Sequence, residues 1–271
     1  EPAGGVAPVP RGPPARLGKN LGEKSYVEVR AKKLAHPRLL WINAEYFRDR
    51  GLAVPSEKEF LDAFAWGIPS EGEPDSAFLD EEKVFMADRY GGGNLGANMG
   101  SGRAASAGEF QIKGVGRTPL VSESGKDGHA NGLVPFHEGR EALFGEINQQ
   151  LPHGGNRVVG FIDRGTKAKL KDGTYHRSVM IIREDPLRPA HYVDAWHGAG
   201  PYVASEAARI KQAAKHFIES LPYPPNMRGA SDKEKLASGL KVYVQRVAEQ
   251  YAAAYARKMY HGATTLSNIE L

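Results

Sequence analysis

The chain has 271 residues, of which 41% are hydrophobic, so it can bury a substantial core in one large or two small domains. Its 36 Lys and Arg against 32 Asp and Glu give a net charge of +4 without a dominant basic block, which argues against a nucleic-acid partner. No apolar run approaches the roughly 18 residues of a membrane span, and the lack of Cys excludes disulfides, a thiolate nucleophile and Cys-based zinc sites.

The first predicted elements follow a Pro/Gly-rich segment, 1–20, which has no aromatic residue and is expected to be a disordered tail. The run Ser56-Glu-Lys-Glu59 predicts a capping box that opens an amphipathic helix. A strand is predicted over Gly108–Gly114. A helix is predicted over Glu138–Leu151, with Leu143, Phe144, Ile147 and Leu151 on one apolar stripe and Glu141 on its flank.

Two more strands are predicted over Arg157–Asp163 and Arg177–Arg183. Everything after Ala204 is expected to be helical, with a break at Leu221–Asn226. In the last helix, Tyr251 and Tyr255 belong to an apolar stripe that we expect to lie in the core.

Mixed strands with one helix, followed by helices, form the order of a protein-kinase-like bilobal α+β fold. We therefore expect a strand-rich N-lobe with one key helix and a mostly helical C-lobe. The expected organisation is a tail over 1–20, an N-terminal extension with the N-lobe over 21–190, and a C-terminally incomplete C-lobe over 191–271.

The stretch Arg89–Pro119 concentrates the residues with the clearest chemistry, because its glycines surround Arg103 and precede Lys113. Glycine permits the left-handed turns that aim several backbone N–H groups at an anion. Arg adds a planar fork of donors and Lys a point charge, and both suit phosphate. A glycine-rich turn before a strand that carries a lysine is also the order found in protein kinases. The alternative is that Lys113 is an ordinary surface lysine.

The last residues keep the spacing of the kinase catalytic loop, in which Asn stands seven positions after His. Here these residues are His261 and Asn268, and Ala263 stands where kinases have the catalytic Asp. Ordinary phosphoryl transfer would therefore lack its base. His261 also fits a structural role at a helix end. Other histidines, His191 among them, lack the spacing of metal ligands and are assigned no role.

Several motifs occur together in an order shared with one known family. They are Tyr90-Gly-Gly-Gly-Asn-Leu-Gly96, Met99-Gly-Ser-Gly-Arg103, Gln111-Ile-Lys-Gly-Val-Gly-Arg-Thr-Pro119, Arg140-Glu141 and His261-Gly-Ala-Thr-Thr-Leu-Ser-Asn268. This pattern resembles the selenoprotein O family of kinase-like protein adenylyltransferases, which carries Y-x-G-H-Q-F-G, L-G-D-G-R, Q-L-K-G-x-G-R-T-P, an R-E pair and H-G-x-x-x-x-D-N. The resemblance runs from about His36 to the last residue. It implies a kinase-like fold that binds ATP in a reversed orientation and transfers AMP to Ser, Thr or Tyr hydroxyls.

The resemblance also implies roles for individual residues. Lys113 resembles the strand lysine that holds phosphates, Glu141 resembles the helix acid that pairs with it, and Ser267 stands where the family has an acidic catalytic residue. The implied nucleotide-binding residues are Gly100, Ser101, Gly102, Arg103, Lys113, Arg183 and Arg188, and the implied metal ligand is Asn268. The implied cofactors are ATP with Mg²⁺ or Mn²⁺, and the implied partner is a protein or peptide with a hydroxyl acceptor. The implied location is the cytoplasm of a bacterium or the mitochondrion of a eukaryote.

Two departures from the family keep other functions open. Ser267 replaces an Asp, and the Asp of the family's D-Y-G or D-F-G turn is expected beyond Leu271, in a C-terminal part that could be a separate chain. Divalent cations generally take carboxylate ligands. The sequence therefore leaves three candidates: an adenylyltransferase, a catalytically impaired pseudokinase that binds nucleotide or partners, and an unorthodox small-molecule kinase. If the kinase-like pairing holds, Lys113 and Glu141 should lie within about 4 Å of each other.

Overall fold

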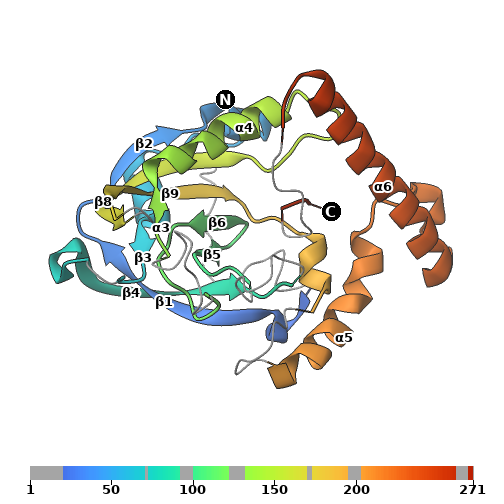
Figure 1. Cartoon of the computed structure of the whole chain (residues 1–271), viewed down its shortest axis with the longest axis horizontal. Coiled ribbons are helices and arrows are strands. Elements are labelled where there is room, and N and C mark those ends of the chain that lie inside the picture. The colour runs from blue at the N-terminus through green and yellow to red at the C-terminus, as the bar shows by residue number, and fades with distance from the viewer. Residues whose placement is uncertain are drawn as a thin grey trace.

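The computed structural model of the chain describes residues 21–70, 73–91, 100–121, 132–169, 173–194, 203–260 and 268–270. Over these residues the chain forms a large antiparallel sheet with helices around it, which confirms the predicted mixed α+β class (Figure 1). The predicted tail over 1–20 lies outside the described residues, as do His261, Ala263 and Ser267. A kinase-like division into two lobes stays a prediction.

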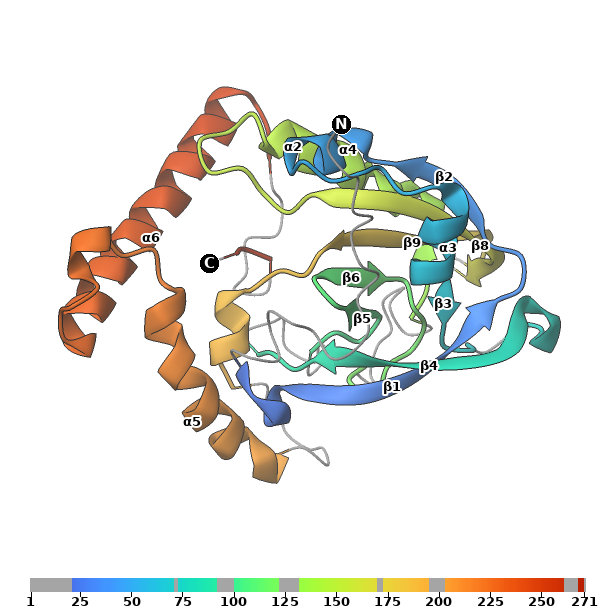
Figure 2. The same cartoon turned by 180° about the vertical axis from the view of Figure 1, so that it is seen from behind.

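The described part of the chain contains a nine-stranded sheet in the order β2-β8-β9-β6-β5-β4-β1-β3, with β7 paired to β9 beside this path. The sheet curves, so that β5 and β6 lie between β1 and β4 on one side and β8 and β9 on the other (Figure 2). The strands are β1 (Tyr26–Leu34), β2 (Arg38–Ile42), β3 (Trp66–Gly67), β4 (Phe78–Asp88), β5 (Ala104–Ala107), β6 (Phe110–Lys113), β7 (Val134–Pro135), β8 (Val158–Lys169) and β9 (Tyr175–Glu184).

The three strands predicted in this region are present. The range Gly108–Gly114 corresponds to β6, Arg157–Asp163 to the first half of β8, and Arg177–Arg183 to most of β9. The hairpin partner of β6, strand β5, was not predicted. Its sequence Ala-Ala-Ser-Ala is buried on both faces and therefore has no polar–apolar alternation to reveal it.

The helices are α2 (Ala44–Asp49), α3 (Glu57–Phe64), α4 (Arg140–Asn148), α5 (Val203–Ser220) and α6 (Asp232–Ala256). Short 3₁₀ segments join them, namely η1 (Glu23–Ser25), η2 (Asp75–Ala77), η3 (Phe136–Gly139), η4 (Pro189–Tyr192) and η5 (Pro225–Met227). The capping box predicted at Ser56 is confirmed, because Ser56 and Glu59 bond to each other's backbone N–H groups. No helix among the described residues is long and apolar enough to cross a membrane.

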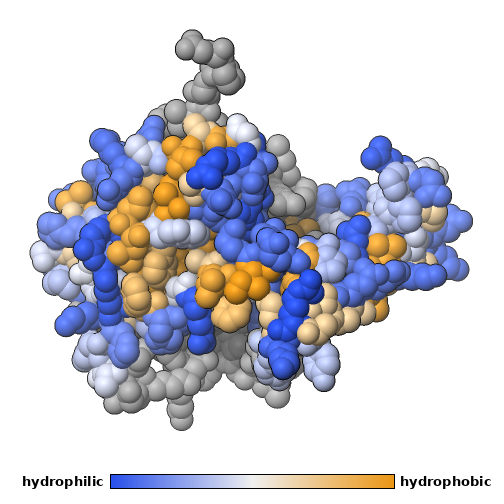
Figure 3. Space-filling view, turned by 90° about the horizontal axis from the view of Figure 1, so that it is seen from above, coloured by the Kyte–Doolittle hydropathy of each residue, from blue (hydrophilic) through white to orange (hydrophobic). Residues whose placement is uncertain are grey.

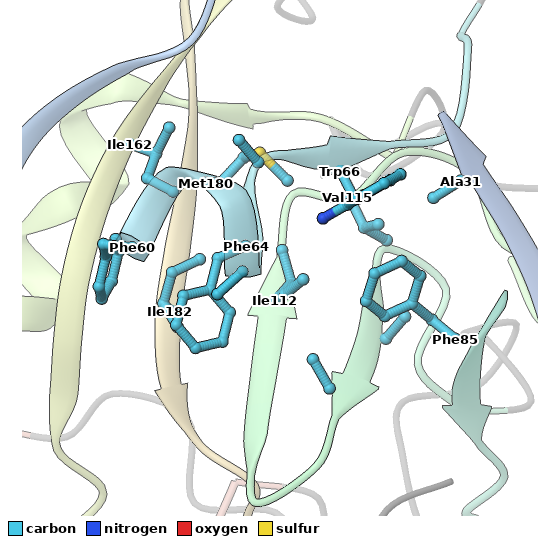
Figure 4. Packing of buried hydrophobic residues seen from close by; sticks show 14 of the residues in the cluster. Ala31, Phe60, Phe64, Trp66, Phe85, Ile112, Val115, Ile162, Met180 and Ile182 are labelled. Carbon is cyan, nitrogen blue, oxygen red and sulfur yellow. The ribbon is translucent and has the colours of Figure 1, made fainter. Parts of the chain in front are cut away.

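The main hydrophobic core lies on one face of the sheet, under α3. Figure 4 shows Phe60 and Phe64 of α3 in the same cluster as Ile112 of β6. Side chains alternate between the two faces of a strand, so Ile112 in the core places Gln111 and Lys113 on the opposite face. The contacts of α4 with β8 and of its Ala142 with a second, smaller cluster put α4 on that opposite face.

Two residues of the predicted apolar stripe, Leu143 and Phe144, are exposed, whereas Ile147 is partly buried and Leu151, just after the helix, is buried. Leu143 is 61% exposed and Phe144 is 47% exposed. The helix approaches the sheet through small residues instead. Ala142 packs on the smaller cluster, and a Cβ added to Gly145 would lie 3.0 Å from the carbonyl oxygen of Asn156. Because the backbones come so close there, Leu143 and Phe144 stay largely exposed, whereas Glu141 of the same helix reaches the sheet.

The prediction that the stripe of the last helix lies in the core is wrong for Tyr255, which is 85% exposed, while Tyr251 is half-buried. Polar contacts join α6 to the segment after α4. The Gln250 side chain accepts from the backbone N–H of His153 at 3.0 Å and donates to the carbonyl of Gly154 at 2.5 Å. A helical pattern shows which residues share a face, but it does not show whether another element covers that face.

Candidate functional site

The candidate site begins with a cross-strand pair on the face that carries α4. Gln111 of β6 lies directly opposite Arg183 of β9 in the antiparallel register. The Nε and Nη2 atoms of Arg183 donate to Oε1 of Gln111 at 3.1 and 2.6 Å. This contact fixes the guanidinium beside Lys113, which lies two residues further along β6 on the same face.

Lys113 forms the ion pair with Glu141 that the sequence predicts. The other carboxylate oxygen of Glu141 pairs with Nη1 of Arg183, so one acid from α4 bridges two cations from the sheet. The side chain of Lys113 is 16% exposed and that of Arg183 is 15% exposed. The alternative of a surface lysine is therefore excluded, whereas the phosphate-binding and catalytic roles of these residues stay predictions.

Burial and neighbouring charges shape the ionisation of this pair. Burial opposes the charge on Glu141, but Arg183 and Lys113 outweigh it and hold the pKa of this carboxyl well below its usual range. Burial also lowers the pKa of Lys113, and the nearby Arg183 and Arg103 lower it further, against the opposite effect of Glu141 and Glu138. The two arginines thus destabilise the charged form of Lys113. An anion that enters the site would stabilise that charged form.

Arg103 supplies a third cation beside Lys113. Its Nη1 and Nη2 atoms donate to the two oxygens of Glu138 at 3.1 and 3.0 Å, in the parallel fork that Arg forms with carboxylates. Glu138 belongs to η3, immediately before α4. Its Oε2 also lies 3.5 Å from Nζ of Lys113. Sequence reasoning missed Glu138, although it stands three residues before the predicted Glu141.

The glycine turn before Arg103 packs against the end of β4. Gly100 has φ 149°, and a Cβ there would lie 2.2 Å from the carbonyl oxygen of Asp88, so only glycine fits. The backbone N–H of Ser101 donates to that same carbonyl at 2.8 Å, and the N–H of Gly102 donates to the carbonyl of Gly100 at 2.9 Å. Both donors are thus used inside the protein, and the turn positions Arg103. Nucleotide contact by the turn itself stays a prediction.

A buried arginine that sequence reasoning missed holds the turn after Lys113. Arg164 of β8 donates from Nη1 to the carbonyls of Gly114 and Val115 at 3.2 and 3.1 Å. Its Nε and Nη2 atoms donate to the two oxygens of Glu73 at 2.7 and 2.9 Å. Neither the Arg164 nor the Glu73 side chain is more than 1% exposed.

A second polar cluster lies behind Gln111, toward α5. The Gln111 amide nitrogen is 3.4 Å from Oδ1 of Asp88, whose Oδ2 is 2.7 Å from Nε2 of His191. The backbone N–H of Arg188 donates to Nδ1 of His191 at 3.0 Å, which leaves Nε2 to donate to Asp88. Burial disfavours the charge on Asp88, but His191 and Arg188 outweigh it and lower its pKa. Arg188 thus lies in this adjacent cluster, with its guanidinium 5.3 Å from the centre of the Tyr90 ring.

Asp185 follows β9 and is 1% exposed. Neither oxygen of its carboxyl has a hydrogen-bond partner among the described residues. Burial and then the charge of Asp88 raise the pKa of Asp185 well above its usual range, so the structure favours the neutral carboxyl. Asp88, Asp185 and His191 were not predicted as part of the site, because the fold brings them together from distant parts of the chain.

The described residues do not supply a complete site for Mg²⁺ or Mn²⁺. Asn268, the expected ligand, is exposed, and Ser267 lies outside the described residues. No group of three or more acidic or histidine side chains in the described ranges could hold a metal ion. Carboxylate oxygens are the usual ligands of these ions, and the described residues do not bring enough of them together to hold one.

A groove of about 400 Å³ lies where α4 meets β2 and β8, and Lys113 is not among its lining residues. Its lining is mostly apolar and consists of Trp41, Gly139, Ala142, Leu143, Glu146 and Phe161. Figure 3 shows hydrophobic side chains gathered on the face of the molecule seen from above Figure 1. None of the three cations Arg103, Lys113 and Arg183 lines this groove.

Comparison with protein-family models and with curated proteins gives no match to this chain. The case for its function therefore rests on the motifs and on the geometry of the site.

Proposed function

We propose that the chain is an ATP-dependent nucleotidyltransferase with a kinase-like fold, similar to the selenoprotein O family, that moves AMP to a hydroxyl of a protein or peptide. The observation that carries the proposal is the bridge from Glu141 on α4 to both Lys113 on β6 and Arg183 on β9. A strand lysine that pairs with a helix glutamate is the arrangement by which kinases place their phosphate-binding lysine.

The three cations suit a triphosphate because they share one face and are largely shielded from water. The exposed fractions of the Arg103, Lys113 and Arg183 side chains are 12%, 16% and 15%. Shielded charges stabilise developing negative charge more strongly than charges in water do, and phosphoryl-type transfer depends mainly on such positioning and stabilisation. Glu141 fixes the position of Lys113 relative to Arg183, and Gln111 orients the guanidinium of Arg183.

In the proposed reaction, the acceptor hydroxyl oxygen forms a bond to the α-phosphorus of ATP. The bond from that phosphorus to the oxygen bridging to the β-phosphorus breaks, and pyrophosphate leaves with the electron pair. The acceptor proton passes to water or to the departing pyrophosphate. Arg103, Lys113 and Arg183 neutralise charge on the phosphates during this exchange.

The second candidate is a pseudokinase that binds nucleotide or a partner without catalysis. It is favoured by the lack, among the described residues, of an acidic cluster that could hold a metal ion. The carboxylate of Glu138 on Arg103 also fits a site that has no turnover.

Calorimetry of ATP binding and labelling with ³²P separate these candidates. The natural full-length protein should bind ATP, Lys113→Ala should not, and Lys58→Ala should bind like the wild type, because the side chain of Lys58 is 86% exposed on α3. Label from α-³²P-ATP should enter a protein target, and label from γ-³²P-ATP should not. Transfer of γ label alone would indicate an unorthodox kinase. ATP binding without transfer of either label would favour the pseudokinase, and equal, unmeasurable heats for wild type and Lys113→Ala would contradict nucleotide binding.

A further inference from the structure

We propose that Glu138 acts as an internal competitor of the phosphate ligand: its carboxylate occupies Arg103 and Lys113, and a ligand must displace it in order to bind. The inference rests on the proposed function, because it takes the ligand to be a nucleotide or another compound with phosphate groups.

The geometry of Glu138 matches that of a bound phosphate. Its two oxygens meet the Nη atoms of Arg103 at 3.1 and 3.0 Å, and one of them lies 3.5 Å from the Lys113 ammonium. A planar guanidinium binds carboxylate and phosphate through the same pair of parallel hydrogen bonds. A phosphate that binds both Arg103 and Lys113 would therefore occupy the position of the Glu138 carboxylate.

Two backbone donors in the described part of the glycine turn do not offer a second place for the anion. The N–H groups of Ser101 and Gly102 already donate to protein carbonyls at 2.8 and 2.9 Å. The anion-binding capacity of this turn thus depends on the side chain of Arg103, together with Lys113 across the hairpin. Both side chains contact Glu138.

Glu138 and Glu141 neutralise different sets of cations and therefore have different roles. Glu141 links Lys113 to Arg183 and holds the two cations at the sheet. Glu138 instead neutralises Arg103 and makes only a longer contact, 3.5 Å, with the Lys113 ammonium. Removal of the Glu138 charge leaves the bridge in place and raises the positive charge that a polyanion meets. Removal of the Glu141 charge would separate the cations from each other.

Glu138 is also placed where it can leave. Its side chain is 25% exposed, and it belongs to η3, in which no residue is buried. The neighbouring Phe136 is 46% exposed. Although Phe136 and Gly139 of η3 pack on Phe161, a rotation of the Glu138 side chain alone can carry its carboxylate into water, so a phosphate can displace it without moving η3 or unfolding α4.

Calorimetry with two probes, ATP and inorganic pyrophosphate, tests the proposal on wild type and Glu138→Gln. Gln keeps the shape and one acceptor oxygen but loses the charge. The matched control is Glu109→Gln, an exposed acid in the β5–β6 turn. We expect Glu138→Gln to bind both probes at least about tenfold more tightly than wild type, a gain of about 1.4 kcal/mol, and the control to leave both affinities unchanged.

Each outcome supports or overturns the proposal. Unchanged or weaker binding of both probes to Glu138→Gln would show that Glu138 only orders Arg103, and would overturn it. Tighter binding of pyrophosphate, with no ATP binding by either protein, would keep Glu138 as the competitor and contradict the nucleotide function. Thermal unfolding of Glu138→Gln within a few degrees of wild type verifies that the comparison is between folded proteins. No binding of either probe by any variant would overturn both proposals.

Discussion

Replacement of Arg164 by Met would test how the sheet supports the turn after Lys113. The Arg164 side chain is fully buried, and it donates to both oxygens of Glu73 and to the carbonyls of Gly114 and Val115. Met keeps an apolar stem of similar length but offers no donor. The change therefore removes the polar contacts without opening a large cavity.

The expected cost follows from the charge that is left behind. The Glu73 side chain is only 1% exposed, and removal of one partner from a buried ion pair costs about 3–5 kcal/mol. This is a large part of the roughly 5–15 kcal/mol by which a domain is stable, so the variant should unfold at much lower urea concentration. Adding Glu73→Gln removes the stranded charge, so the double variant should be more stable than Arg164→Met alone.

The pH dependence gives a second measure. Burial opposes the charge on Glu73, but Arg164 outweighs it and lowers the pKa of this carboxyl. The resulting stability is present above the unfolded pKa of about 4.3 and is lost as the pH falls. Without Arg164, burial is opposed only by the hydrogen bonds from Thr166 and Ser70, so the pKa of Glu73 rises and the charged carboxylate costs the variant stability at neutral pH. The difference from wild type should therefore be larger at pH 7.5 than at pH 4.5.

Urea unfolding of the wild type, Arg164→Met, Glu73→Gln and the double variant, each at pH 4.5 and pH 7.5, measures these differences in the free energy of unfolding. A loss of less than about 1 kcal/mol for Arg164→Met at pH 7.5 would refute the reasoning, because it would mean that Glu73 is not stranded. An equal loss at pH 4.5 and 7.5 would also refute it. ATP binding by the variant at a temperature where it is folded should be weakened, since the turn after Lys113 is no longer held.

Two further predictions concern stability. In Gly160→Ala, the added Cβ would lie 2.1 Å from Cζ of Phe60, so we expect the free energy of unfolding in urea to fall by about 1–3 kcal/mol. A second substitution, Phe60→Leu, should recover part of this loss, and strictly additive losses in the double variant would contradict the clash. Asp185→Asn should raise the melting temperature at pH 7.5 but not near pH 4, because the raised pKa of Asp185 makes its ionisation unfavourable in the folded state; a difference that is constant with pH would contradict this.

The sequence predicted best what depends on residues close together in the chain. The capping box needs only Ser56 and Glu59, three positions apart, and it is present. The alternation of β6 separates Ile112 from Lys113 as a strand requires. The ion pair between Lys113 and Glu141 spans 28 residues, and the family resemblance, not local pattern, predicted it.

What the sequence did not reveal depends on packing between distant segments. The contact of Asp88 with His191 joins residues 103 positions apart, and both are fully buried. The exposure of Leu143 has the same origin, since the close approach at Gly145 decides which side of α4 faces the sheet. A pattern of apolar residues shows which face of a helix is the most hydrophobic, but the shape of the neighbouring element decides which face packs against it.

These long-range contacts join the candidate site to the helices after it. From Glu141 they pass through Arg183 and Gln111 to Asp88 and His191. The carbonyl of His191 then accepts from Nη1 of the fully buried Arg209 on α5 at 2.7 Å. Buried polar groups are costly when they lose a partner, so each contact restrains the next. The orientation of Arg183 is therefore tied to the packing of α5 against η4, a different helix from the one that carries Glu141.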